Sequence, residues 1–239
     1  MIKLPISLEG LVEYLLKEKS SSLNFLEMML TVNRFQLLSA LKKLDGIEVM
    51  EDSVKVDNRV KLVISALKIG INPKTISKYL DWKEFEDEVA RIFEEAGFII
   101  AKNFRTNEPK RTETDIIALK EGIVLAIDCK HWELSKSIAS SYKNAALKHV
   151  ERVAKLIESE KFMKWLVKWE TKRDILVVPV LITLSSRPGG FINGVISVPI
   201  SYISNFAQNM DAWIDQAGQF NVEIKRVTIN EGCTKIDAC

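Results

Sequence analysis

Several features are scarce in this 239-residue sequence, and each scarcity narrows what the chain can be. It contains no uninterrupted run of about 18 apolar residues, which a membrane-spanning helix would need, and its N-terminus lacks the basic and apolar pattern of a signal peptide. We therefore expect a soluble cytoplasmic protein with no membrane partner. The formal net charge is only +2, so any binding to an acidic polymer must come from local basic patches.

Histidine and cysteine are also rare. His131 and His149 are the only histidines, and Cys129, Cys233 and Cys239 show no Cys-x-x-Cys spacing. A zinc site is therefore not expected, and Cys129 is interpreted as a small apolar residue rather than as a nucleophile. An odd cysteine count in a highly charged chain is typical of a reducing compartment. We expect no small-molecule cofactor.

Residues 112–132 carry the most informative pattern. Residues 116–119 and 123–127 are short apolar runs rich in β-branched side chains, and the Lys-Glu-Gly between them is typical of a tight turn. A loop of two to four residues places Asp115 opposite position 126, 127 or 128, and paired strands are about 5 Å apart. Asp115 and Asp128 are therefore expected to be neighbours in space.

Asp128 and Lys130 are two residues apart, so alternation along a strand puts both on one face. Adjacent carboxylates repel each other and favour a hard divalent cation, Mg²⁺ above all, with Mn²⁺ as a substitute. The lysine would orient a metal-activated water and stabilise negative charge. The pattern predicts phosphodiester hydrolysis, with Asp115, Asp128 and Lys130 as catalytic residues. The alternative is a plain ion pair at the end of a strand.

A helix expected at 83–96 offers a third acidic residue. Its apolar side chains define one face at about 100° per residue, and Glu86 projects from the edge of that face. Glu88 and the other acidic residues of this helix fall outside the face. We therefore interpret Glu86 as a further catalytic residue and metal ligand, direct or through water. A simple surface glutamate is the alternative, and Glu113 near Asp115 is a spare candidate ligand.

The order of these motifs resembles a known family. A helix with Glu86, then Asp115, then Asp128-Cys129-Lys130 is similar to the PD-(D/E)XK nuclease superfamily, and most similar to its Mrr-type restriction endonucleases and archaeal Holliday-junction resolvases. The resemblance covers about residues 82–205. Each motif is short, so their order and spacing carry the specificity.

Two positions depart from the family pattern. Thr114 stands where the name-giving proline would be, and Asp128 stands where glutamate or glutamine is more common, which shortens the ligand by one methylene. The resemblance implies a DNA endonuclease that depends on Mg²⁺ and assembles as a homodimer. Two alternatives remain: an RNA endonuclease, because the same chemistry cleaves either backbone, and an inactive DNA-binding or regulatory protein on the nuclease fold.

Residues 1–80 are predicted to form a separate, mainly helical module. Helices expected at 8–17, 23–30 and 34–44, followed by a hairpin at 47–56, resemble a winged helix-turn-helix. The third helix would enter the DNA major groove, unless the module packs against protein instead. Its expected inner side consists of Phe35, Leu38, Ala40 and Leu41. A connecting helix from 59 to about 68 is expected to be capped by Asp57.

Basic side chains on this module, on the loop before Asp115 and on a long helix at 140–159 could hold a nucleic acid backbone. The predicted nucleic-acid-binding residues are Arg34, Lys43, Lys102, Arg105, Lys110, Arg111 and Lys143.

The remaining elements complete a fold prediction. Residues 161–169 are expected to extend the long helix or to form a second one. A buried strand at 175–184, a strand at 194–200 and a helix at 202–217 are also expected. Together with the earlier elements they predict an α/β fold: a restriction-endonuclease-like mixed central sheet flanked by helices over 81–229, preceded by the winged-helix-like module over 1–80 and followed by a loose tail over 230–239.

Overall fold

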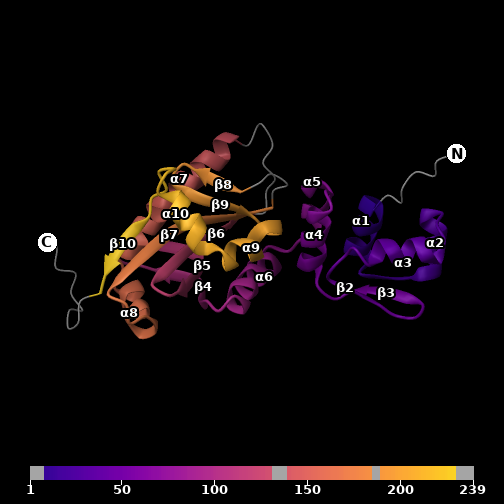
Figure 1. The fold of residues 1–239 in the computed structure, drawn as a ribbon, viewed down its shortest axis with the longest axis horizontal. Coiled ribbons are helices and arrows are strands. Elements are labelled where there is room, and N and C mark those ends of the chain that lie inside the picture. The colour runs from indigo at the N-terminus through magenta and orange to yellow at the C-terminus, as the bar shows by residue number, and fades with distance from the viewer. Residues whose placement is uncertain (1–7, 131–138, 185–188, 230–239) are drawn as a thin grey trace. The chain divides into compact units, whose positions relative to one another are not determined.

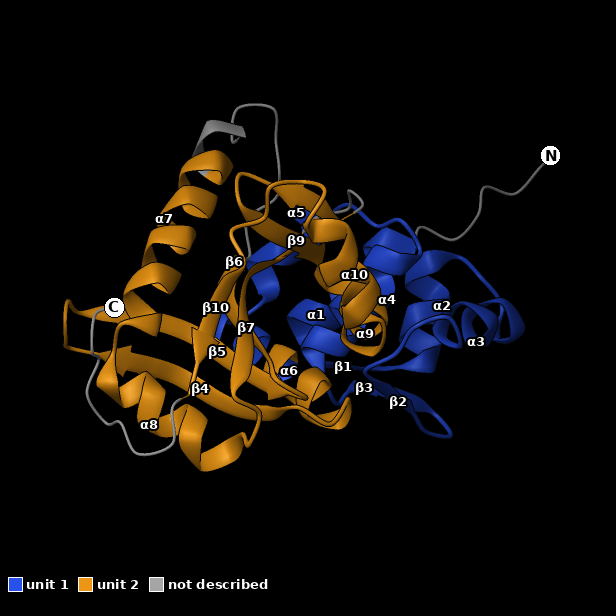
Figure 2. Cartoon of the chain, turned by 60° about the vertical axis from the view of Figure 1, so that its left-hand side comes forward, with its two compact units in different colours: residues 1–88 blue, residues 89–239 orange. Residues whose placement is uncertain are grey.

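A computed structural model describes residues 8–130, 139–184 and 189–229 of the chain. The chain divides into two compact units, Met1–Glu88 and Val89–Cys239, coloured separately in Figure 2. The division falls inside the helix α6 (Trp82–Glu95), whereas the sequence placed the boundary before this helix. The predicted loose tail lies outside the described residues.

The first unit consists of short helices and a small antiparallel sheet with the strand order β1-β3-β2. The predicted helices and hairpin are present, but β1 was not predicted, because three serines show no apolar alternation. The name winged helix stays a prediction. The elements are α1 (Leu8–Glu18), β1 (Ser20–Ser22), α2 (Leu23–Leu30), α3 (Arg34–Leu41), β2 (Ile47–Val49), β3 (Ser53–Val56), α4 (Arg59–Lys68), α5 (Pro73–Ile76) and the 3-10 helix η1 (Ser77–Tyr79).

Two details of this unit correct the sequence analysis. The inner side of α3 is formed by Leu37, Ala40 and Leu41, whereas Phe35 is 81% exposed and the side chain of Leu38 is only partly buried. The spacing i, i+3, i+4 starting at 37 defines the buried face, and a phenylalanine at 35 falls outside it. The cap of α4 is Asn58 instead of Asp57, and the Asn58 side chain accepts a hydrogen bond from the Lys61 amide.

The second unit begins within α6 and contains one large sheet. The helix predicted at 202–217 is broken at Asn209 into two helices, and the strand β8 was not predicted. The elements are β4 (Ile99–Thr106), β5 (Thr112–Lys120), β6 (Ile123–Lys130), α7 (Ala139–Ile157), α8 (Glu160–Trp169), β7 (Asp174–Thr183), β8 (Gly190–Ile192), β9 (Val195–Pro199), the 3-10 helix η3 (Ile200–Tyr202), α9 (Ile203–Gln208), α10 (Met210–Ala217) and β10 (Lys225–Thr228).

The large sheet is mixed, with the order β4-β5-β6-β7-β9-β8. The pairs β6–β7 and β7–β9 are parallel, and the other pairs are antiparallel. A parallel pair needs a long crossover, which α7 and α8 supply between β6 and β7. The predicted α/β fold with a mixed central sheet flanked by helices is confirmed.

Helices cover both faces of this sheet (Figures 1 and 2). On one face, a cluster of buried side chains joins β4–β7 to α7 and α8, with Phe162 packed edge-to-face on Phe104. On the other face, the ring of Phe206 in α9 lies against Phe93 of α6 and Trp213 of α10. The Asp128 side of β6 faces α7, so that helix forms one wall of the candidate site.

The strand β7 accommodates a proline at its centre. Along one edge β10 pairs with residues 174–177 and β9 pairs with residues 180–183. Pro179 therefore lies in the gap between these two partners, where the absence of a backbone N–H costs no hydrogen bond on that edge.

Candidate active site

The hairpin β5–β6 places the two predicted carboxylates side by side. Its ladder runs from Lys120↔Ile123 to Ile116↔Ile127, so the same register puts Asp115 opposite Asp128. The connecting turn has two residues, Glu121 and Gly122, both with positive φ. This is the turn type that matches the twist of paired strands, and it fixes the register. The predicted hairpin is therefore present, with the shortest of the loop lengths considered, two residues.

Asp128 is buried between two cations. Its side chain is 2% exposed, with Oδ2 lying 2.6 Å from Lys130 Nζ and Oδ1 lying 2.7 Å from Arg152 NH2. Lys130 extends from the same face of β6, whereas Arg152 reaches across from α7. A buried carboxylate needs such partners, because an unpaired charge in this position would be strongly unfavourable.

Asp115 lies at the edge of this cluster. Its Oδ2 accepts a 2.8 Å hydrogen bond from the Cys129 amide, which extends the hairpin beyond the last ladder pair. Burial raises the pKa of Asp115, and the neighbouring charge of Asp128 raises it further, against the opposing effects of the Cys129 amide and of Lys130 and Arg152. The two carboxylates therefore repel each other, and the charges of Lys130 and Arg152 offset this repulsion.

His149 anchors the helix that carries Arg152. The imidazole is fully buried and its Nε2 lies 2.8 Å from the carbonyl oxygen of Ala126, two residues before Asp128. Burial lowers the pKa of His149 to about 4. The ring is therefore neutral near pH 7, and Nε2 donates to the carbonyl. His149 and Arg152 are three residues apart and lie on the same side of α7.

Sequence reasoning did not assign Arg152 or His149 to the site. The long helix was predicted, but its rotation toward β6 was not. A signal does exist: His149 lies at helical spacing from Ala146 and Val153, which are both buried. A histidine on such a face indicates a polar partner in the sheet beneath, and the arginine three residues later shares that face.

The helix α6 buries two glutamates where one was expected. Glu86 is 8% exposed and Glu88 is 5% exposed, and Glu88 accepts a hydrogen bond from Asn58 Nδ2. The expectation that Glu86 is the one acidic residue of this helix beside its buried face is therefore wrong. Glu88 is buried as well, because the opposite edge of the helix is also covered. Within the described ranges, no group of three or more His, Cys, Asp or Glu side chains is arranged to hold a metal ion. Glu86 as a third ligand stays a prediction.

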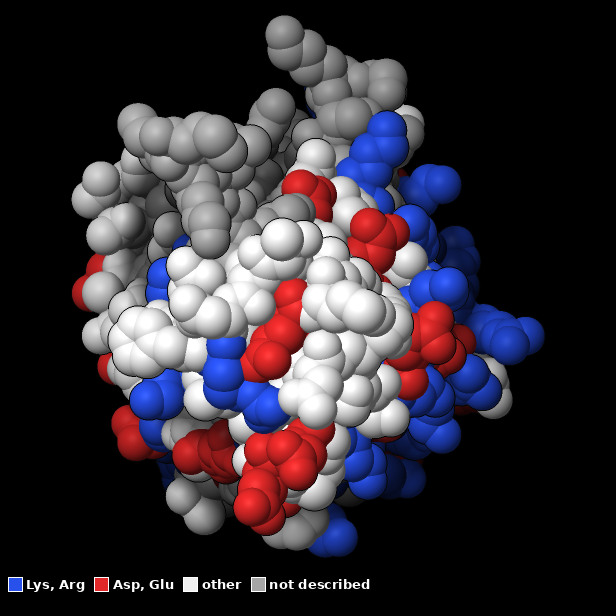
Figure 3. All heavy atoms as spheres, turned by 90° about the vertical axis from the view of Figure 1, so that its right-hand side faces the viewer, with Lys and Arg blue, Asp and Glu red and all other residues white. Residues whose placement is uncertain are grey.

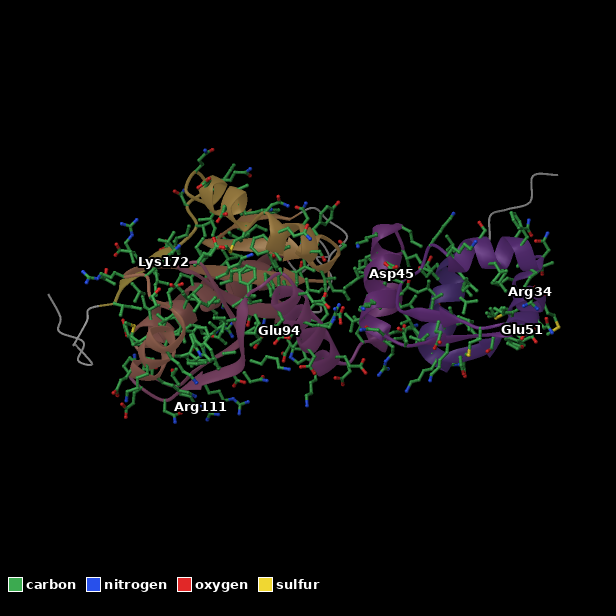
Figure 4. The ribbon with its side chains drawn as sticks, turned by 60° about the horizontal axis from the view of Figure 1, so that its bottom comes forward. Arg34, Asp45, Glu51, Glu94, Arg111 and Lys172 are labelled. Atoms are coloured by element: carbon green, nitrogen blue, oxygen red, sulfur yellow. The ribbon has the colours of Figure 1, made fainter. Side chains whose placement is uncertain are left out.

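The predicted basic residues of the second unit lie on its surface. The exposed ones are Lys102, Arg105, Lys110, Arg111 and Lys143. Figure 4 labels Arg111, which comes from the connection between β4 and β5. Arg105 forms a 2.8 Å ion pair with Glu113, and this pairing raises the pKa of Arg105. Glu113, the spare candidate ligand, therefore already has a cationic partner.

The N-terminal end of α3 uses its polar side chains internally. Asn33 and Gln36 form a reciprocal capping box, and Arg34 contacts Glu27 at 2.5 Å and Asn24 at 2.6 Å. Figure 4 shows Arg34 beside Glu51, whose carbonyl oxygen it also contacts. A DNA contact by Arg34 would have to break these interactions. Lys43, the other predicted contact of this unit, is exposed.

The same unit exposes apolar side chains. Figure 3 shows a largely uncharged area bordered by acidic and basic residues on the side where α2, α3 and the hairpin β2–β3 lie in Figure 1. The exposed large apolar residues of these elements are Phe25, Met28, Met29, Phe35, Val49 and Met50. These residues agree better with the alternative of a protein contact than with a DNA-reading helix.

Comparison with known proteins assigns the family. Residues 77–169 match the restriction endonuclease family Mrr_cat. A relative from Archaeoglobus fulgidus, named only as an uncharacterized protein, is 35% identical over 138 residues, which are 57% of this chain and 97% of the relative. The chain belongs to the Mrr_cat restriction endonuclease family. Asp115, Asp128, Lys130 and Arg152 all lie within the Mrr_cat segment.

Three solved structures are similar at low TM-scores. AF1548, a protein of unknown function, has a TM-score of 0.27 and 22% identity over 41% of this chain and 44% of its own, so the aligned segment spans less than half of that structure. VC1899 from Vibrio cholerae has a TM-score of 0.37 and 12% identity over 89% of this chain and 52% of its own. The small subunit of the heterodimeric restriction endonuclease R.BspD6I has a TM-score of 0.34 and 11% identity over 67% of this chain and 88% of its own. The match of residues 77–169 to Mrr_cat confirms the predicted resemblance to restriction endonucleases for that segment. No helix in the described part of the chain is long and apolar enough to cross a membrane.

Proposed function

We propose that this protein is a metal-dependent DNA endonuclease that hydrolyses phosphodiester bonds. One observation carries the proposal: Asp115 and Asp128 lie opposite each other on paired strands of an Mrr_cat domain, and Lys130 contacts Asp128. The donor set fits a divalent metal, because Mg²⁺ commonly takes one or two protein carboxylates together with water and phosphate oxygens.

Each residue has a separate role in this proposal. Asp115 and Asp128 hold Mg²⁺, or Mn²⁺ in its place, and Glu86 contributes directly or through water. A bound divalent ion polarises a phosphoryl oxygen and lowers the pKa of a coordinated water. Lys130 is 20% exposed, so its ammonium can orient the attacking water and stabilise the negative charge that develops on the phosphoryl group.

The surrounding basic side chains would position the substrate. Contacts from Lys102, Lys110, Arg111 and Lys143 to phosphates add affinity without reading sequence, and this affinity falls as salt rises. Arg105 could join them only by exchanging its partner Glu113 for a phosphate. DNA is proposed as the substrate because the chain belongs to a restriction endonuclease family.

Two further assignments stay predictions: the homodimer, which rests on the resemblance alone, and the cytoplasmic location, which rests on the sequence composition. A homodimer would let two active sites address two strands, and light scattering on the purified chain would test it.

The decisive experiment is cleavage of a substrate panel with Mg²⁺, Mn²⁺ or EDTA. The panel contains supercoiled plasmid, single-stranded DNA, a four-way junction and structured RNA. Asp128→Asn and Lys130→Gln remove the charges at the site, while Asp211→Asn and Lys164→Gln make the same changes on exposed surfaces. We expect metal-dependent cleavage of DNA that falls by about 100-fold or more in the first two variants and stays unchanged in the controls.

Other results would revise the proposal in specific ways. Cleavage that survives both site variants would show that the catalytic residues lie elsewhere. Preferential cleavage of RNA would make RNA, and not DNA, the proposed substrate. Retention of DNA on a gel without cleavage of any substrate would favour a binding protein on a nuclease scaffold.

A further inference from the structure

Arg152 is a second cation on Asp128, in addition to the lysine of the motif. We propose that Arg152 is an internal counter-ion that competes with the divalent metal for Asp128, so that the site gains metal affinity when a nucleic acid phosphate draws the guanidinium away. The inference rests on the proposed function and concerns how the same site is regulated.

The charges of the cluster support this competition. With both carboxylates ionised, Asp115 and Asp128 contribute two negative charges and Lys130 and Arg152 contribute two positive charges, so the charges of these four groups balance without a metal. A divalent ion entering this partly buried cluster would leave it with an excess of positive charge, which is unfavourable where water cannot screen it. Without Arg152, the same cluster would carry one net negative charge and would attract the ion.

The contacts of Asp128 also support a competition between Arg152 and a metal ion. Both of its carboxylate oxygens lie within 2.7 Å of a cation, and the side chain is 2% exposed. A metal ligand must present a lone pair to the ion, so binding to Oδ1 requires Arg152 to move or to share that oxygen. Lys130 belongs to the same strand and is needed for catalysis in the proposed mechanism. Arg152 is therefore the partner that can be exchanged.

Arg152 is placed to exchange partners. Its side chain is 32% exposed, so the guanidinium is within reach of a ligand from solvent, and only its NH2 group contacts Asp128. A guanidinium has five N–H donors and forms its best contacts with phosphate through two of them. Arg152 would therefore gain a hydrogen bond on moving to a phosphate. His149 holds the backbone of α7 in place, so only the arginine side chain has to move.

This arrangement couples two binding events. If a phosphate removes Arg152 from Asp128, nucleic acid raises the metal affinity, and the metal raises the nucleic acid affinity by the same factor. The ion would then load mainly when substrate is present. General attraction of cations by DNA would not depend on Arg152, and this difference makes the inference testable.

The test is the affinity for Mn²⁺, measured by calorimetry on the full chain with and without a short phosphorothioate DNA duplex, after subtraction of Mn²⁺ binding to the duplex alone. Arg152→Gln removes the counter-ion, and Arg152→Lys keeps a positive charge. Lys148→Gln makes the same change as Arg152→Gln at an exposed position of α7. We expect Arg152→Gln to bind Mn²⁺ about 10-fold more tightly than wild type without DNA, and Lys148→Gln to match wild type. The duplex should tighten Mn²⁺ binding to wild type and Arg152→Lys clearly more than to Arg152→Gln.

The outcomes separate this inference from the proposed function. Equal Mn²⁺ affinity in wild type and a folded Arg152→Gln variant would overturn the inference and leave the nuclease proposal standing. If Arg152→Gln does not fold, the duplex must still tighten Mn²⁺ binding to wild type, and the absence of that effect would overturn the inference. No Mn²⁺ binding by any variant, with or without DNA, would overturn the metal-dependent function as well.

Discussion

The wild-type protein should lose stability as the pH falls from about 7.5 to about 5, because of His149. A His149→Gln variant should not show this loss. The imidazole is fully buried, and this burial lowers its pKa from the usual 6.5 to about 4. Between these two values the unfolded chain takes up a proton and the folded protein does not. The stabilisation is therefore fully present above pH 6.5 and is lost progressively as the pH falls toward 4.

The size of this effect follows from the shift. One pKa unit corresponds to about 1.4 kcal/mol, and integration over this pH interval gives a loss of about 2 kcal/mol in the free energy of unfolding. The charged neighbours act in opposite directions, because Asp128 favours the protonated imidazole, whereas Arg152 and Lys130 oppose it. Burial remains the largest cause of the shift.

The assay is urea denaturation followed by tryptophan fluorescence at both pH values. The glutamine amide of His149→Gln can still donate to the Ala126 carbonyl but does not titrate. Other groups, including Asp115 with its raised pKa, contribute to both proteins and cancel in the comparison. The wild type should lose about 2 kcal/mol more than the variant between the two pH values. The same pH dependence in both proteins would refute the assignment of a neutral, buried His149.

Three further predictions concern the packing, and chemical denaturation checks each of them. Phe162→Ala removes a fully buried ring from its contact with Phe104 and should cost about 3–5 kcal/mol, so a loss below about 1 kcal/mol would contradict the packing. Phe35→Ser should change stability by less than about 0.5 kcal/mol because the ring is 81% exposed, and a large loss would support the inner position expected from the sequence. Gly122→Ala should cost about 1–2 kcal/mol, because Gly122 has a φ of 83° and an added Cβ would lie 2.8 Å from Lys172 Cδ; unchanged stability would argue against this turn.

Local patterns explain why much of the second unit could be predicted. The hairpin register depends on only a few residues around Glu121-Gly122, and strand alternation places Asp128 and Lys130 on one face without further information. The long helix, the strand with Pro179 and the mixed sheet also follow from local periodicity and the order of elements. The small first unit was predicted less well, because on a short helix such as α3 a few exposed apolar residues are enough to suggest the wrong inner face.

The contact between Arg152 and Asp128 could not be predicted in the same way. The two residues are 24 positions apart, and their meeting depends on the length of the crossover and on the rotation of α7 about its axis. This single contact changes the chemical expectation. The motif alone has two carboxylates and one lysine, which predicts a site that attracts a divalent ion by itself. With Arg152 included the charges balance. Metal binding is therefore expected to depend on a substrate phosphate that binds the arginine in place of Asp128.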